Sequence, residues 1–104
     1  SPLKLTIKVN MLNFKASPLS FLLDRGFVAT LRTGRFKVGQ VVDVLECGRH
    51  HRGYAEVVEV REASWRNVET YWRLSGFNSP EEWWDQALKL HGRRPRVIVF
   101  LQLL

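Results

Sequence analysis

The chain has 104 residues, of which 16 are lysine or arginine and 10 are aspartate or glutamate, for a formal net charge of +6. This length suits a single domain over residues 1–104, and 45% hydrophobic and 12% aromatic residues suffice for a packed core, which excludes a disordered or collagen-like chain. The longest apolar run, Val97 to Leu101, is far shorter than the roughly 20 residues of a membrane-spanning helix. A lone Cys47 has no partner for an internal disulfide, so we expect a cytoplasmic protein.

The positive charge is concentrated in the first half of the chain. Residues 1–53 carry nine basic and three acidic side chains, whereas the remaining residues carry seven of each. A one-sided excess of this kind attracts polyanions, and the phosphate backbone of nucleic acids is the commonest of these in cells. From composition alone, a soluble basic domain whose charge only prevents association fits equally well.

The first quarter of the chain predicts a strand and a helix. Apolar and polar side chains alternate over residues 3–9, as in a strand with one buried face. Ser17 is suited to cap a helix with Pro18 at its first position, and Gly26 is suited to end it, so we expect a helix over residues 19–25.

The middle of the chain predicts strands. Alternation over residues 27–32 places Phe27, Ala29 and Leu31 on one side of a second strand. A turn follows, and then we expect strands over residues 40–46 and 54–61, joined by a hairpin loop at residues 49–52 that glycines flank.

Two helices and a final strand complete the predicted order. Trp65 and Trp72 recur at helical spacing, and a second helix begins after Ser79 and ends at Gly92. The β-branched run at residues 97–101 predicts a central strand. The order favours an α+β fold, a mixed β-barrel of about five to six strands with short helices at its ends.

Several stretches resemble ASCH domains, a branch of the PUA-like superfamily. They are residues 26–32, residues 35–40, residues 54–57 with Val60, the pair Gly76-Phe77, and residues 97–100. The resemblance covers the chain from about residue 20 onward. It implies a PUA-like barrel and a nucleic-acid ligand.

The sequence departs from the family pattern at two positions that matter for catalysis. Some small bacterial relatives resemble amidohydrolases that act on N4-acetylcytidine with a motif lysine, a threonine and a glutamate before the Gly-Phe pair. Here Thr30 matches the threonine, but Phe27 occupies the lysine position and Ser75 the glutamate position. A phenyl ring has no acid-base or nucleophilic chemistry, and a serine without a base is a poor replacement. We therefore expect no catalytic residue and no cofactor.

The strand at residues 27–32 carries the candidate binding residues. Thr30 and Arg32 lie two apart and point to one face, and Arg35 and Lys37 project from the adjoining turn, so we expect the four to form one anion cleft. A guanidinium binds a phosphate through two parallel hydrogen bonds, and a hydroxyl beside it can contact a base or ribose. The alternative is an arginine whose stem covers apolar surface while its head lies in water.

The predicted loop at residues 49–52 offers a second set of contacts. Arg49 and Arg52 are suited to hold a phosphate backbone, and His50 is suited to stack on a base. A solvated hairpin tip explains the same residues. Although Cys47 lies nearby, too few further ligands are in sight for a structural zinc ion, and we expect no metal.

We expect Trp65, Trp72 and Trp84 to face the core and the neighbouring Trp83 to be partly exposed. The preferred hypothesis is an ASCH-type module that binds nucleic acid, with RNA favoured. The alternatives are an amidohydrolase acting on N4-acetylcytidine and a protein-interaction module that uses an exposed Trp83.

Overall fold

The computed structural model describes residues 10–104, so the strand predicted over residues 3–9 lies outside the described residues. The described chain is an α+β domain with one five-stranded sheet and three short α-helices. In chain order the elements are β1 (Asn10–Phe14), α1 (Ala16–Arg25), β2 (Phe27–Arg32), β3 (Val41–Glu46), β4 (His50–Glu62), α2 (Trp65–Tyr71), the 3₁₀ turn η1 (Trp72–Leu74), α3 (Pro80–His91) and β5 (Val97–Leu103). No helix in residues 10–104 has the length and apolar character needed to cross a lipid bilayer.

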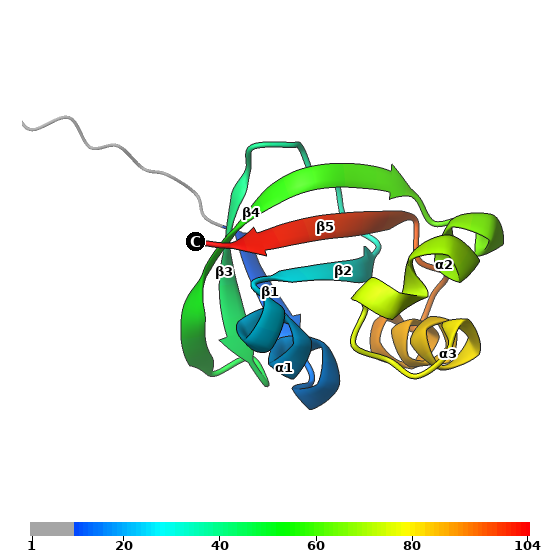
Figure 1. The fold of residues 1–104 in the computed structure, drawn as a ribbon, viewed down its shortest axis with the longest axis horizontal. Coiled ribbons are helices and arrows are strands. Elements are labelled where there is room, and N and C mark those ends of the chain that lie inside the picture. The colour runs from blue at the N-terminus through cyan, green and yellow to red at the C-terminus, as the bar shows by residue number, and fades with distance from the viewer. Residues whose placement is uncertain (1–9) are drawn as a thin grey trace, which may run out of the picture.

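The strands lie in the order β1-β3-β4-β5-β2, and the sheet curls into a half-barrel (Figure 1). β1 is parallel to β3, and the other neighbouring pairs are antiparallel. β5 lies between β4 and β2, which confirms the central strand predicted at residues 97–101. Within the described residues β1 and β2 are the two edges of the sheet, so the mixed barrel expected from the sequence is an open, curled sheet.

Alternation along β2 divides its side chains between two cores. Val28 faces the inside of the curled sheet, where α1 covers it with residues such as Leu22. Ala29 and Leu31 face the opposite side, where α2 and α3 cover the sheet and Trp83 packs against it. The side predicted for Ala29 and Leu31 is therefore confirmed. Because β2 separates two cores, it is held firmly from both sides.

Helix α1 begins earlier than the sequence predicts. Its N-cap residue is Lys15, whose side chain makes no capping hydrogen bond. The prediction that Ser17 caps the helix is wrong, because Ser17 and Pro18 lie within the first turn, where a proline is tolerated since those backbone N–H groups lack an intrahelical acceptor. Gly26 ends the helix in the left-handed conformation, with φ at 74°, as predicted.

The hairpin between β3 and β4 is tighter than the predicted loop. The turn lies at residues 47–49, and β4 already begins at His50, which pairs with Glu46. The prediction of a loop at residues 49–52 is wrong for its last three residues. Gly53 does not mark the start of the strand but lies opposite Val44, where the ladder shifts register in a bulge.

Helices α2 and α3 lie together at one end of the sheet (Figure 1). Ser79 caps α3 as predicted, since its Oγ accepts a hydrogen bond from the Glu82 backbone N–H at 3.0 Å. Gly92 ends the helix in the left-handed conformation, also as predicted. These two caps set the length of α3, Pro80–His91.

The tryptophans are distributed differently from the prediction. Trp83 is 2% exposed and packs in the core that α2 and α3 share with the sheet, whereas Trp84 is only partly buried. Trp65 is 41% exposed at the start of α2. The predicted exposure of Trp83 and burial of Trp65 are therefore wrong, because helical periodicity gives the angle between side chains but not which face meets the sheet. This removes the argument for a protein-interaction surface at Trp83.

Candidate nucleotide-binding cleft

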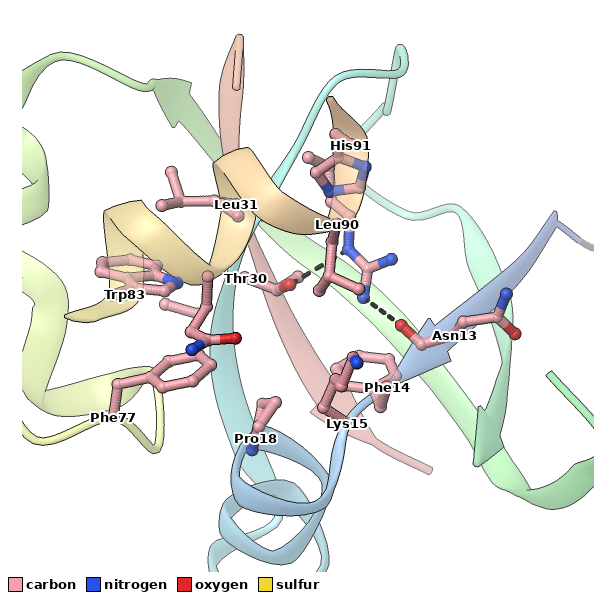
Figure 2. Close-up of a pocket in the computed structure, with 14 residues that line it drawn as sticks. Asn13, Phe14, Lys15, Pro18, Thr30, Leu31, Phe77, Trp83, Leu90 and His91 are labelled. Carbon is pink, nitrogen blue, oxygen red and sulfur yellow. Dashed lines mark hydrogen bonds between the residues drawn. The ribbon is translucent and has the colours of Figure 1, made fainter. Parts of the chain in front are cut away.

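A cleft lies along the edge of β2 (Figure 2). Residues 29–32 line it from β2, residues 13–15 from the junction of β1 and α1, and Phe77 and α3 from the other side. Its smaller part has a volume of about 40 Å³, and an adjoining hollow of about 270 Å³ shares residues 13–15 and Leu90 with it. The smaller part alone suits a few water molecules, whereas the two together just reach the lower end, about 300 Å³, of small-molecule sites. We call the two together the β2 cleft.

Thr30 and Arg32 point into this cleft from the same side of β2, as their spacing predicts. Arg32 Nε donates a hydrogen bond to Thr30 Oγ1 at 3.1 Å, and Arg32 Nη2 donates to the Asn13 carbonyl oxygen at 2.8 Å (Figure 2). The guanidinium carbon lies 4.9 Å from the centre of the Phe14 ring. These contacts fix the guanidinium, and the Thr30 hydroxyl, whose oxygen accepts from Arg32, keeps its proton for a ligand acceptor.

The charge of Arg32 has no counter-ion in the described part of the chain. Burial lowers the pKa of Arg32 to about 10, so the guanidinium is still charged at neutral pH. None of the ion pairs among residues 10–104 includes Arg32. A desolvated cation is unfavourable unless an anion or a strong acceptor pairs with it. The unpaired guanidinium is thus the centre of a candidate anion site.

His91, in the last turn of α3, also lines the cleft. Burial lowers the pKa of His91 below its ordinary value of 6.5, and the positive charge of Arg32 lowers it further, while a hydrogen bond with the Leu31 backbone opposes both. The imidazole is therefore neutral at pH 7 and supplies a donor or an acceptor rather than a second charge.

We expect the protein to lose stability as the pH falls through the titration of His91. The unfolded chain binds a proton at His91 near pH 6.5, but the folded protein binds it only at lower pH, so stability rises with pH across that window. His91→Gln removes the effect because glutamine does not titrate. Thermal unfolding of both proteins from about pH 8 to about pH 5 measures it. The melting temperature of the natural protein should fall more steeply, and parallel curves would contradict this assignment.

Arg35 and Lys37 do not line the β2 cleft. They line a separate hollow of about 460 Å³ together with Arg96, Glu62 and neighbouring residues, and the two sites share no lining residue. The single cleft expected from the sequence is therefore two sites. The side chain of Arg32 leaves β2 toward the β1–α1 junction, whereas the turn after β2 carries Arg35 and Lys37 to the end of β4 and the start of β5. We call this second site the Arg96 hollow.

The basic residues of the β3–β4 hairpin are exposed and lie beside the cleft rather than in it. Arg49 is the last residue of the turn, and His50 is the first residue of β4. Arg52 is engaged within the hairpin, since its Nη1 donates to Glu46 Oε1 at 2.6 Å. Cys47 of the same turn lines the larger part of the cleft. The hairpin tip therefore borders the mouth of the β2 cleft.

The two positions that depart from the family's catalytic pattern lie outside the cleft. Phe27 faces the other side of β2, where its ring lies 6.2 Å from that of Phe100. Ser75 is fully buried, and its hydroxyl donates to the Trp72 carbonyl oxygen and accepts from the Phe77 N–H. Both residues stabilise the fold, and neither lines the cleft.

The sequence did not predict the side of the β2 cleft that residues 13–15 line, opposite α3. Asn13, Phe14 and Lys15 reach the cleft because β1 ends beside β2 in space, although the two strands are not paired. Their sequence carries weak strand alternation and no recognisable motif. The site role of His91 was likewise not predicted, because its place one residue before Gly92 indicates only the last turn of α3, and the packing of α3 beside β2 brings it to the cleft.

Within residues 10–104 no group of three or more histidine, cysteine, aspartate or glutamate side chains is placed to hold a metal ion. Comparison of the chain with models of known protein families, with curated proteins and with solved structures finds no match.

Proposed function

We propose that this protein is an ASCH-type, PUA-like module of the cytoplasm that binds single-stranded RNA through the β2 cleft. The observation that carries the proposal is Arg32, a half-buried and charged guanidinium, fixed by three contacts and without a carboxylate partner in the described chain. A phosphate oxygen supplies the negative charge that such a group lacks.

The cleft offers a nucleotide two kinds of contact. The N–H groups of Arg32 that bond neither Thr30 nor Asn13 can donate to an anion or a carbonyl oxygen of the ligand, and the Thr30 hydroxyl can donate its proton to a base or ribose oxygen. Leu90 and Lys15 line both parts of the cleft, so apolar and cationic surface lie beside the same opening. This combination suits one nucleotide whose phosphate remains near solvent.

Other basic residues are assigned to the flanking backbone. Arg49, His50 and Arg52 lie on the hairpin that borders the cleft, and Arg35 and Lys37 line the Arg96 hollow. All except Arg52 are outside the ion pairs of the described residues. A single strand that leaves the cleft past the hairpin meets the positive charge of Arg49.

The test is the salt dependence of RNA binding. Fluorescence anisotropy of a labelled single-stranded RNA of about ten nucleotides should give an affinity that falls steeply between about 50 mM and about 200 mM salt, with a slope of about −0.7 per phosphate contacted. An oligomer of the same bases on an uncharged backbone is the control. Equal affinity for the charged and uncharged strands would overturn the proposal.

Amidohydrolysis of N4-acetylcytidine is the second candidate. The observation in its favour is the Thr30 hydroxyl in the cleft, at the position of the threonine of the hydrolytic relatives. The observation against it is that Phe27 and Ser75, which occupy the lysine and glutamate positions of those relatives, do not line the cleft. Release of acetate from the nucleoside, abolished by Thr30→Ala, would establish this activity, whereas RNA binding without turnover favours the first candidate.

A further inference from the structure

The Arg96 hollow gathers three cations and a single carboxylate, so its lining carries a net positive charge. Arg35, Lys37 and Arg96 line it, and Glu62 is the only carboxylate among its lining residues. None of these four residues takes part in the ion pairs of residues 10–104. Like charges around one hollow repel each other, and this repulsion costs free energy. An anion bound in the hollow attracts all three cations and offsets that free energy.

Hydrogen bonds fix the backbone of two of these three residues, Arg96 and Lys37. Arg96 N–H donates to the Arg32 carbonyl oxygen at 3.0 Å, and the Arg96 carbonyl oxygen accepts from Ala63 N–H at 3.0 Å. Lys37 begins a turn in which its carbonyl oxygen accepts from Gln40 N–H at 3.1 Å and its N–H donates to Gln40 Oε1 at 3.2 Å. Arg96 is thus pinned between the ends of β2 and β4.

An exposed aromatic side chain lies close along the chain to the residues of the hollow. Trp65 opens α2 three residues after Glu62, and 41% of its surface is accessible. Its ring meets that of Trp84 edge-on, with centroids 6.2 Å apart, and the Arg94 guanidinium lies 5.8 Å from the centre of the Trp84 ring. Arg94 is two residues from Arg96, and Trp65 is two residues from Ala63, whose N–H bonds the Arg96 carbonyl oxygen, so these side chains are close chain neighbours of the hollow. We call Trp65, Trp84 and Arg94 the Trp65 platform.

We infer that the Arg96 hollow and the Trp65 platform form a second binding surface for the same single strand, with backbone phosphates in the hollow and a base stacked on Trp65. Cationic grooves that hold phosphates beside aromatic rings that stack bases are how proteins bind single strands without sequence preference. The carboxylates of an acidic peptide would also meet the cations, but Asp and Glu side chains have no flat ring to stack on the exposed indole. The inference rests on the proposed function and makes the ligand a strand of several nucleotides rather than a free nucleotide.

The test compares variants of the full chain for binding to single-stranded RNA of about ten nucleotides and to a mononucleotide. Trp65→Ala and Arg96→Gln should each weaken binding of the long strand about tenfold and leave mononucleotide binding unchanged, since the mononucleotide occupies the β2 cleft. Trp65→Phe should retain most of the affinity because a phenyl ring still stacks. Melting curves of each variant verify that it is folded.

Arg25→Gln is the matched control. Arg25 is an exposed arginine that lies over an aromatic ring, 4.9 Å from the centre of Phe21, but it belongs to α1 and does not line the hollow. Arg25→Gln removes the same charge as Arg96→Gln and should change the affinity for single-stranded RNA by no more than about twofold. If Trp65→Ala and Arg96→Gln behave like Arg25→Gln while the natural protein binds RNA, this inference is wrong and the proposed function stands. If the natural protein binds no RNA, both fail. If a glutamate-rich peptide binds instead, and Trp65→Ala abolishes that binding, the surface is a protein interface.

Discussion

Gly76→Ala is expected to lower the free energy of unfolding by about 3 kcal/mol, the largest effect on stability that we predict for a single methyl group. Gly76 has φ at 84°, in the left-handed region, which costs a residue with a Cβ about 1–2 kcal/mol. An added Cβ would also lie 2.7 Å from the Ser17 carbonyl oxygen and 2.9 Å from Pro18 Cα. Those atoms belong to the backbone of α1, so a side-chain rotation cannot relieve the contact.

The matched control is Gly92→Ala. Gly92 has φ at 65°, and a Cβ built on it meets no atom within 4 Å, so only the backbone cost of about 1 kcal/mol applies. Urea unfolding of both variants separates conformational strain from steric overlap. Equal losses for Gly76→Ala and Gly92→Ala would show that the close approach of the Gly76 turn to α1 does not contribute. Because Phe77 and Pro18 line the β2 cleft on the two sides of this contact, Gly76→Ala should also disturb RNA binding.

Arg32→Ala is expected to weaken binding of single-stranded RNA by about tenfold to hundredfold, the largest effect on ligand binding that we predict. The substitution removes one charge-assisted contact with a phosphate. The slope of the logarithm of affinity against the logarithm of salt concentration should therefore decrease by the amount that one phosphate contact contributes. Arg32→Lys keeps the charge but loses the planar guanidinium and the Nε bond to Thr30. Its affinity for RNA should therefore lie between those of the natural protein and Arg32→Ala. Anisotropy titrations at two salt concentrations measure both quantities.

Arg25→Ala is the control for Arg32→Ala, because it removes an exposed arginine from the end of α1 without touching the cleft. Its effect should stay near twofold. Thermal unfolding should show that Arg32→Ala is still folded, since removing a desolvated cation offsets part of the lost hydrogen bonding and packing. An Arg32→Ala protein that binds RNA as tightly as Arg25→Ala would exclude Arg32 from the site.

Local signals predicted most of the elements that position the cleft. The alternation of residues 27–32 gave the bounds of β2 and the shared side of Thr30 and Arg32, because a strand places every second side chain on one face. Ser79 and Gly92 gave the two ends of α3, since a capping hydroxyl and a left-handed glycine act within a few residues of chain. The error at Ser17 arose because α1 begins after Lys15 without a capping side chain, and the error at residues 49–52 arose because the turn at residues 47–49 is tighter than the flanking glycines indicate.

What the sequence by itself determined is therefore the identity of the strand that carries Thr30 and Arg32, the ends of α3 and the excess of positive charge. Only the tertiary structure decided that Asn13, Phe14 and His91 surround Arg32, that Arg35 and Lys37 lie in a different hollow, and that Trp65 rather than Trp83 is exposed. Periodicity fixes the angles between neighbouring side chains, whereas contacts between β1, β2 and α3 depend on how the sheet curls and which helix face covers it. No local pattern encodes that arrangement.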